Sequence, residues 1–139
     1  MAKVNEEKLL RVIDANINRT KEGLRVCEDV CRFFLNDAAA SRVFKRTRHQ
    51  IIKVIDALGL KNIIKARNIE GDVGRGSIKA EFKREGVRDI FCANAQRAKE
   101  SIRVLEEFSK LLAKYKLTAS LKSIRYQIYA VEKKVIGKI

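Results

Sequence analysis

Apolar residues recur every three or four positions along four long stretches of the chain, which is the spacing of one face of an α-helix. The predicted helices cover about residues 5–35, 37–59, 87–114 and 119–136. Asn5 and Asp37 stand first in two of these stretches, Thr118 directly precedes the last, and all three are expected to act as N-caps. Tyr115–Thr118 is therefore predicted to be a turn, and residues 61–66 fit either a short helical turn or an extended segment.

One polar pattern occurs twice. Eight of the fifteen positions from Ala15 to Asp29 are identical in the stretch from Ala93 to Glu107, 78 positions later. The repeated polar pairs are Asn16/Asn94, Arg19/Arg97, Glu22/Glu100, Arg25/Arg103 and Glu28/Glu106. The repeat continues at an offset of 77, where Lys45/Lys122, Arg48/Arg125 and Gln50/Gln127 match.

The duplication predicts the architecture. We expect an all-α bundle of about four long helices, formed by two duplicated hairpins at residues 5–59 and 86–137. A Gly-rich connecting loop, residues 60–85, joins them within a single domain spanning residues 1–139, with approximate twofold symmetry.

The repeated stripe has two readings. On a helical wheel Asn16 and Gly23 fall within the apolar face formed with Cys27, Cys31 and Phe34. A buried Asn needs partners, and Gly in mid-helix costs about 1 kcal/mol relative to Ala. The stripe is either a polar site cut into a shared interior, with Gly23 making room, or a hydrogen-bond network with surface ion pairs. The repetition favours the site.

The connecting loop has three Gly within six residues, at 71, 74 and 76, beside Arg67, Asp72 and Arg75. Glycines allow backbone N–H groups to approach an anion closely, although the spacing is not that of a Walker motif. A phosphate-binding loop and a solvated connector both remain open.

The composition limits the possible classes of protein. With 46% hydrophobic and 35% charged residues and no Pro, the chain is expected to fold. It has no apolar run of about 20 residues, and Met1–Asn5 does not begin like a signal peptide, so a cytoplasmic location is expected. Three cysteines argue against a disulfide framework, and Cys27 and Cys31, on the apolar face, are expected to be buried thiols.

The net charge of +14 attracts anions. Arg binds phosphate with a planar fork, and interleaved carboxylates suit Mg²⁺, so the residues fit phosphoryl transfer. A phosphate acceptor is already anionic near neutral pH and would need no general base. The single histidine, His49, is expected to be structural or exposed more readily than catalytic.

Both copies of the motif, Ala66-Arg67 with Gly71-Asp-Val-Gly74, and Arg125-Tyr126 with Tyr129 resemble a known family. This is the small helical hydroxymethylpyrimidine-phosphate kinase family of thiamin biosynthesis, whose domain often occurs fused in front of thiamin phosphate synthase. The resemblance covers about residues 5–135 and implies ATP-dependent phosphorylation of 4-amino-5-hydroxymethyl-2-methylpyrimidine phosphate. The family usually has Asp where this chain has Asn68, which bears on metal binding.

The candidate site follows from the repeated positions and the loop. Catalytic roles are expected for Arg19, Arg97 and Asp72, and metal binding for Asp72, Glu22 and Glu100. Substrate or phosphate contacts are expected from Asn16, Glu22, Arg25, Arg48, His49, Arg67, Gly71, Gly74, Asn94, Glu100, Arg103 and Arg125.

Three alternatives to a kinase remain. The chain fits a noncatalytic partner or sensing module of thiamin phosphate synthase, a basic nucleic-acid-binding protein, or a helical module that forms a homodimer. Nucleic acid is disfavoured because the repeated Arg are matched by carboxylates and only 6% of residues are aromatic.

Overall fold

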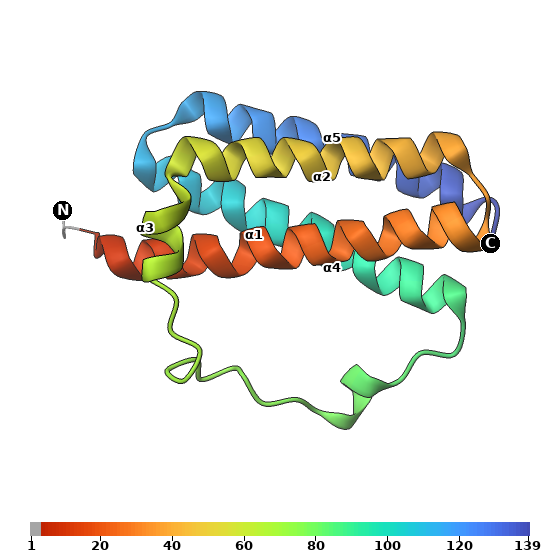
Figure 1. Cartoon of the computed structure of the whole chain (residues 1–139), viewed down its shortest axis with the longest axis horizontal. Helices are drawn as coiled ribbons and strands as arrows, with labels where there is room; N and C mark the ends of the chain where they lie inside the picture. Colours follow the sequence, from red (N-terminus) through yellow and green to blue (C-terminus); the bar gives the residue numbers. More distant parts are fainter. Residues whose placement is uncertain (1–3) are drawn as a thin grey trace.

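The computed structural model describes residues 4–139, and within that range each regular element of secondary structure is a helix (Figure 1). The α-helices are α1 (Glu6–Asp29), α2 (Ala38–Leu58), α3 (Leu60–Lys65), α4 (Val87–Ser109) and α5 (Tyr115–Ile136). The all-α prediction is confirmed, and α3 resolves the segment that the sequence left open. Of the helices in residues 4–139, none is long and apolar enough to cross a membrane. The signal-peptide expectation rests largely on residues 1–3, which lie outside the described range.

Two predicted N-caps are confirmed, and one is wrong. The side chains of Asn5 and Asp37 accept hydrogen bonds of 3.0 Å from the backbone N–H groups of Lys8 and Ala40. Helix α5 begins at Tyr115, so Thr118 lies inside its first turn and does not cap it. Its hydroxyl pairs with the Ser109 hydroxyl at 2.6 Å. The chain reverses two positions before the helix, through the left-handed backbone of Ala113, and so leaves no room for the predicted turn at 115–118.

The first helical segment continues beyond α1 as a π-helical turn, Val30–Phe34, close to its predicted end. The wider π turn changes the angular spacing of side chains from that of an α-helix. Phe34, which the α-helical wheel placed on the apolar face with Cys31, is consequently 68% exposed, whereas Cys31 is buried. The predicted apolar face of the first helix is therefore wrong at Phe34, its last residue.

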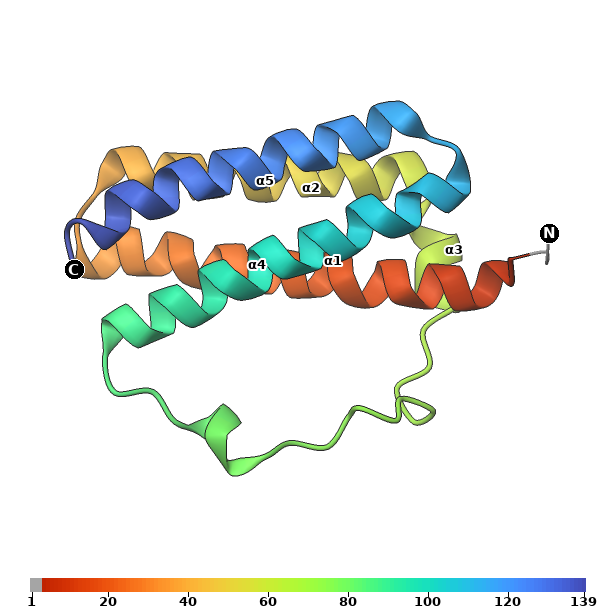
Figure 2. The same cartoon turned by 180° about the vertical axis from the view of Figure 1, so that it is seen from behind.

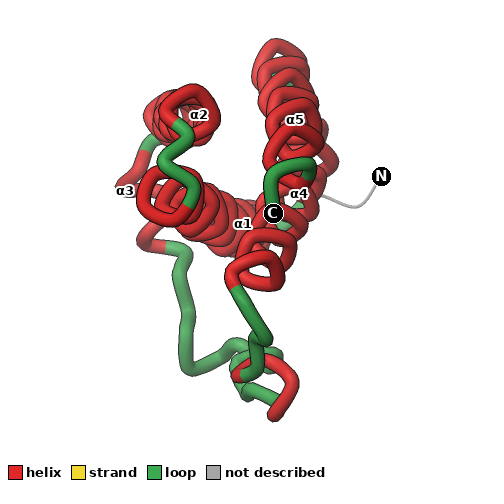
Figure 3. Tube along the Cα trace, turned by 90° about the vertical axis from the view of Figure 1, so that its right-hand side faces the viewer, coloured by secondary structure: helices red, strands yellow, loops and turns green. Residues whose placement is uncertain are grey.

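Helices α1 and α4 run antiparallel and form the central pair of the bundle, with α2 packed on α1 and α5 packed on α4 (Figures 1 and 2). Seen from the end, α2 and α5 stand further apart than α1 and α4 (Figure 3). Phe44 and Phe91 meet edge to face in the core, with ring centroids 5.8 Å apart. The Cys27 thiol is buried and donates to the carbonyl of Phe91, as expected for a structural thiol.

The close approach of α1 and α4 depends on Gly23. A Cβ atom at this position would lie 2.8 Å from the backbone oxygen of Asn94 and 3.4 Å from the Ala98 Cβ. At the equivalent contact on the other side of the twofold axis, Thr20 and Ser101 pair through their hydroxyls at 2.7 Å. Gly23 therefore makes room for the backbone of α4, and the space between these helices is filled by protein.

The duplication is also present in the ion pairs. Glu28 accepts from the Arg48 Nε at 3.0 Å and joins α1 to α2. Glu106 accepts from the Arg125 Nη2 at 3.0 Å and joins α4 to α5 in the same way. Both carboxylates are buried, at 4% and 3% exposure, so each hairpin is held by one buried ion pair.

Candidate functional site

A groove of about 850 Å³ lies along the N-terminal half of α1, between this helix, the start of the connecting loop and Val104 of α4. We call it the α1 groove. It brings together five of the predicted site residues: Asn16, Arg19, Glu22, Arg67 and Asp72. It also contains polar residues that the sequence analysis did not select, namely Lys8, Arg11, Asp14, Asn18 and Asn68. The volume is within the range of small-molecule sites, about 300–1,000 Å³.

The central feature of the α1 groove is a bidentate ion pair between α1 and the loop. The Nε and Nη2 atoms of Arg67 each donate to a carboxylate oxygen of Asp14 at 2.7 Å. These hydrogen bonds and the charge of Asp14 raise the pKa of Arg67 above its usual value. Arg11 adds a second tether by donating to the Asn68 carbonyl at 3.3 Å. The start of the loop is therefore fixed against α1.

Repetition could not identify Asp14, because the equivalent position in the second half is Cys92. Asp14 is only 6% exposed, and a buried carboxylate must be paired. The sequence feature that could have identified Asp14 is its place directly after the apolar residues Val12 and Ile13. Such an acid predicts a cationic partner somewhere else in the chain.

The N–H groups of the loop glycines, which the phosphate-binding alternative directed at an anion, instead bond within the loop. The Gly71 N–H donates to Asn68 Oδ1 at 2.8 Å, and the Gly74 N–H donates to Asp72 Oδ1 at 2.9 Å. The loop satisfies these amides itself, so in this conformation they are not presented to an anion. All residues from 67 to 86 are exposed, as the solvated-connector alternative expected. Asn68 accepts through an oxygen that Asp also has, so its departure from the family pattern preserves this turn.

The repeated stripe lies at the edge of the α1–α4 interface, and the prediction of a shared polar interior is wrong. Asn16 is buried and donates to the Val12 carbonyl at 2.8 Å, and Asn94 bonds to the Ile90 carbonyl in the same way. Arg19 is exposed and donates to Asn16 Oδ1 at 3.3 Å. Because Gly23 lets the two helices approach closely, longer polar side chains are placed at the surface.

On α4, Arg97 lies beside Glu22 at the side of the α1 groove, with its Nη2 atom 4.0 Å from the Glu22 carboxylate. Both side chains are more than half exposed, so this pair adds little to stability. It does bring a repeated arginine of the second half beside the groove. Arg97 is therefore a sixth predicted residue at this place.

The remaining predicted residues lie elsewhere. Arg48 and Arg125 occupy the buried ion pairs described above, and Arg25 and Arg103 lie beside the same carboxylates at 3.8 and 3.9 Å. Glu100 is exposed and accepts from Gln96, and His49 is exposed on α2. For these residues a role in substrate binding stays a prediction.

Within residues 4–139 there is no cluster of three or more His, Cys, Asp or Glu side chains that could hold a metal ion. The predicted trio is divided, since Glu22 and Asp72 share the α1 groove and Glu100 does not line it. Mg²⁺ at phosphoryl-transfer sites usually takes one or two carboxylates together with substrate phosphates. Glu22 and Asp72 fit that mode of binding.

Comparison with known proteins gives consistent matches. The model of the ThiD2 family matches residues 11–134. A thiamine-phosphate synthase of Nostoc punctiforme is 35% identical over 133 residues, which cover 95% of this chain and 36% of that protein. The protein of the same name from Prochlorococcus marinus is 38% identical over 128 residues, covering 91% of this chain and 36% of that protein. The chain thus spans about a third of the length of these relatives, and no solved structure matches it.

Proposed function

The chain belongs to the ThiD2 family and is related to proteins of thiamin biosynthesis, and we propose that it is the kinase of this pathway that uses 4-amino-5-hydroxymethyl-2-methylpyrimidine phosphate. ATP would supply the γ-phosphoryl group, and the pyrimidine diphosphate and ADP would be the products. The single observation that carries the proposal is the α1 groove. It combines several cations with two carboxylates beside a fixed Asp14–Arg67 pair.

The charges in the groove suit a phosphorylated substrate bound with a metal. Lys8, Arg11 and Arg19 line it. Arg11 and Arg19 hydrogen-bond to amide oxygens of Asn68 and Asn16, so their charges can still oppose phosphate oxygens, whereas Arg67 is already paired with the Asp14 carboxylate. Arg and Lys neutralise the charge that is spread over a transferring phosphoryl group. Mg²⁺ entering with ATP would be held by Glu22 and Asp72 and would supply further neutralisation of the nucleotide phosphates.

The reaction forms one bond and breaks another. An anionic oxygen of the acceptor monophosphate attacks the γ-phosphorus, and the bond from that phosphorus to the β,γ-bridging oxygen breaks. The second pKa of a phosphate monoester is about 6, so the attacking oxygen is already ionised and no proton must be removed. Arg19, which donates to Oδ1 of the buried Asn16, would hold the acceptor or the transferred phosphate.

The test is to incubate the purified chain with ATP, Mg²⁺ and the pyrimidine monophosphate, and to follow ADP and the diphosphate. Arg19→Ala should lower kcat/KM by about 100-fold, as removal of one charge-stabilising donor does. Arg42→Ala removes an exposed cation of α2 and serves as the charge-matched control. Full activity of Arg19→Ala would remove this residue from the mechanism.

The acceptor provides a second check. The free hydroxymethyl alcohol should not be phosphorylated, because its neutral hydroxyl requires a general base. Turnover of the alcohol at a rate similar to that of the monophosphate would contradict the proposed mechanism. Asp72, a carboxylate of the groove, would then be the first residue to examine as a base.

The second candidate function is a partner or sensing module. It is favoured by the relatives, in which the matched segment is about a third of a longer thiamine-phosphate synthase. If the chain shows no turnover but forms a stable complex with a thiamine-phosphate synthase, this function replaces the kinase. A steep fall in affinity for DNA or RNA with salt would instead support the nucleic-acid alternative.

A further inference from the structure

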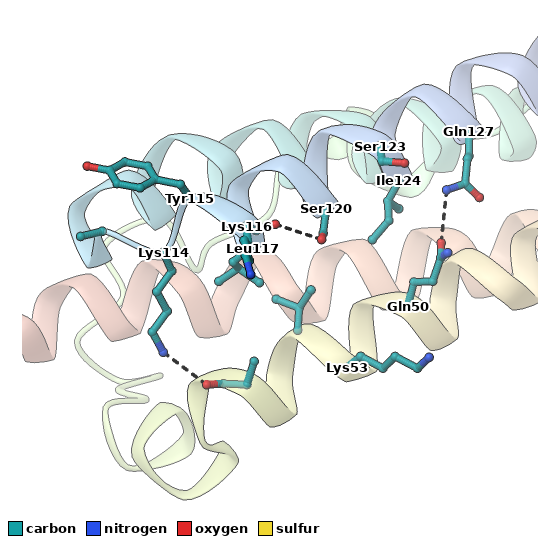
Figure 4. Close-up of a pocket in the computed structure, with 13 residues that line it drawn as sticks. Gln50, Lys53, Lys114, Tyr115, Lys116, Leu117, Ser120, Ser123, Ile124 and Gln127 are labelled. Atoms are coloured by element: carbon teal, nitrogen blue, oxygen red, sulfur yellow. Dashed lines mark hydrogen bonds between the residues drawn. The ribbon is translucent and has the colours of Figure 1, made fainter.

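A second groove, of about 840 Å³, lies between the C-terminal half of α2 and the N-terminal half of α5 (Figure 4). We call it the α2–α5 groove. Val54, Leu117 and Ile124 give it an apolar wall, and Gln50 and Gln127 meet near one end, where Gln127 donates to Gln50 at 3.4 Å. The residues that line it do not overlap with those of the α1 groove. The kinase proposal gives this groove no role.

Because the chain is duplicated, the α2–α5 groove has a counterpart, which we call its twin, at the equivalent positions of the same two helices. The equivalent positions of α2 and α5, related by the offset of 77, form a cavity of about 250 Å³ near the other ends of the same helices. Where the larger groove has Ser123 and Ala57, the twin has Arg46 and Lys134. Arg46 is exposed and donates to Gln127 at 3.3 Å across the twin cavity. The side lined by two small residues thus has the larger groove, and the side lined by two long side chains has the smaller cavity.

The charged side chains that line the α2–α5 groove are all positive. Lys53, Lys114 and Lys116 line it, and of the described lining residues none is Asp or Glu. The N-terminus of α5 opens here, and within residues 4–139 no side chain caps it, because Lys114 occupies the N-cap position. The free N–H groups of a helix start add to the attraction for an anion. The α1 groove differs in this respect, since it contains Asp14, Glu22 and Asp72.

We propose that the α2–α5 groove binds a planar nitrogen heterocycle that carries a phosphate group. The ring packs on the wall formed by Val54, Leu117 and Ile124, and the Gln50 and Gln127 amides pair with its hydrogen-bonding edge. The lysines hold the phosphate, without a metal. A nucleoside monophosphate and a pyrimidine phosphate share this chemistry. The site is separate from the α1 groove, so it can be tested whether or not the chain is a kinase.

Amide NMR of the ¹⁵N-labelled full chain, titrated with AMP, adenosine, inorganic phosphate or the pyrimidine monophosphate, tests the proposal. AMP or the pyrimidine monophosphate should shift the amides of Ser120 and Ser123, and the stronger of the two identifies the source of the ligand. The double variant Ala57→Lys/Ser123→Arg copies the closed twin and should weaken that binding at least tenfold. Arg42→Ala, at an exposed position of α2 that lines neither groove, is the matched control and should leave these shifts unchanged.

Circular dichroism should show that the double variant is folded, because its twin positions carry the same side chains on equivalent backbone. If it does not fold, Lys116→Ala, at an exposed position, gives the same test with an expected loss of several-fold. Equal binding by adenosine would overturn the phosphate part of the proposal, and equal binding by inorganic phosphate would overturn the ring part. Absence of shifts at Ser120 and Ser123 with every probe would overturn the whole proposal.

Discussion

The two hairpins of this molecule share their framework and differ in their grooves. The first hairpin is held by Glu28 with Arg48 and the second by Glu106 with Arg125, in matching geometry. Gene duplication would produce this similarity, and the need to pack a long helix on its partner would maintain it. The polar residues that repeat most faithfully therefore include the ones that hold each hairpin together.

Each groove also contains positions at which the two halves differ. Asp14 fixes the loop beside the α1 groove, and its counterpart in the second half is Cys92. Ser123 leaves the α2–α5 groove open, and its counterpart is Arg46. In this duplicated bundle, the repeated polar residues include both the ion pairs of the framework and part of the grooves. Departures from the repeat show where the grooves of the two halves differ.

The largest expected effect comes from breaking the shared framework. Arg48→Ala and Arg125→Ala should each lower the free energy of unfolding by about 3 kcal/mol, because each leaves a buried carboxylate without its partner. Glu106 also raises the pKa of Arg125 through their hydrogen bonds, which keeps the guanidinium charged. Urea denaturation measures both values. If the halves are equivalent scaffolds, the two losses agree within about 1 kcal/mol.

An apolar replacement of both partners gives the control. Glu106→Leu/Arg125→Leu removes the unpaired charge and should recover much of the loss seen in Arg125→Ala. A loss below 1 kcal/mol in only one hairpin would mean that the repeated pair is scaffold in one half and is free to bind a ligand in the other.

The contact between α1 and α4 gives the second largest effect. Gly23→Ala should destabilise the chain by about 1–2 kcal/mol, since its Cβ would meet the Asn94 backbone oxygen and this outweighs the better helix propensity of Ala. Ser101→Ala, at the equivalent position, should cost about 1 kcal/mol, because the Thr20 hydroxyl keeps its bond to the Asn16 carbonyl. Thermal unfolding compares them. A neutral Gly23→Ala would show that the helices can separate slightly without cost.

The sequence predicted the helices well because their apolar spacing and the caps at Asn5 and Asp37 are local signals. It also located the duplication, which is visible as identity at a fixed offset. It did not predict that α4 approaches α1 so closely at Gly23, because that depends on which helices pair and in which direction. Once this contact is known, the placement of the repeated stripe at the surface follows.

Of the candidate site, the sequence identified Arg67 and Asp72 from the loop and Arg19 from the repeat. It missed Asp14 and the α2–α5 groove for a common reason. Asp14 and Arg67 are 53 positions apart, and Ser123 and Ala57 become notable only beside their bulky counterparts. A site formed by residues distant in sequence, or by small side chains, leaves no local pattern to read.

The smallest effect concerns the starts of α2 and α5, where Asp37 and Lys114 occupy equivalent N-cap positions. Asp37→Ala should cost about 1 kcal/mol, as loss of an N-cap does. Hydrogen bonds from the Ala40 N–H and from Lys138 lower the pKa of Asp37 below its ordinary 3.8. Its contribution is therefore complete above about pH 4 and is lost as the pH falls through the lowered pKa. Urea midpoints of the unaltered chain and of Asp37→Ala, measured from pH 2 to 7, should converge at the acid end.

Lys114→Asp sharpens the same comparison, because it gives α5 the cap that α2 has. The backbone angles at the two positions are similar, with φ of −91° and −102°, so the new carboxylate can reach the free N–H groups. Stability should rise by about 0.5–1 kcal/mol. The same change places an acid in the α2–α5 groove, and AMP binding there should weaken several-fold. If stability and binding both rise, Lys114 does not hold an anion. If stability rises while binding falls, the uncapped helix is maintained for its ligand at a cost in stability.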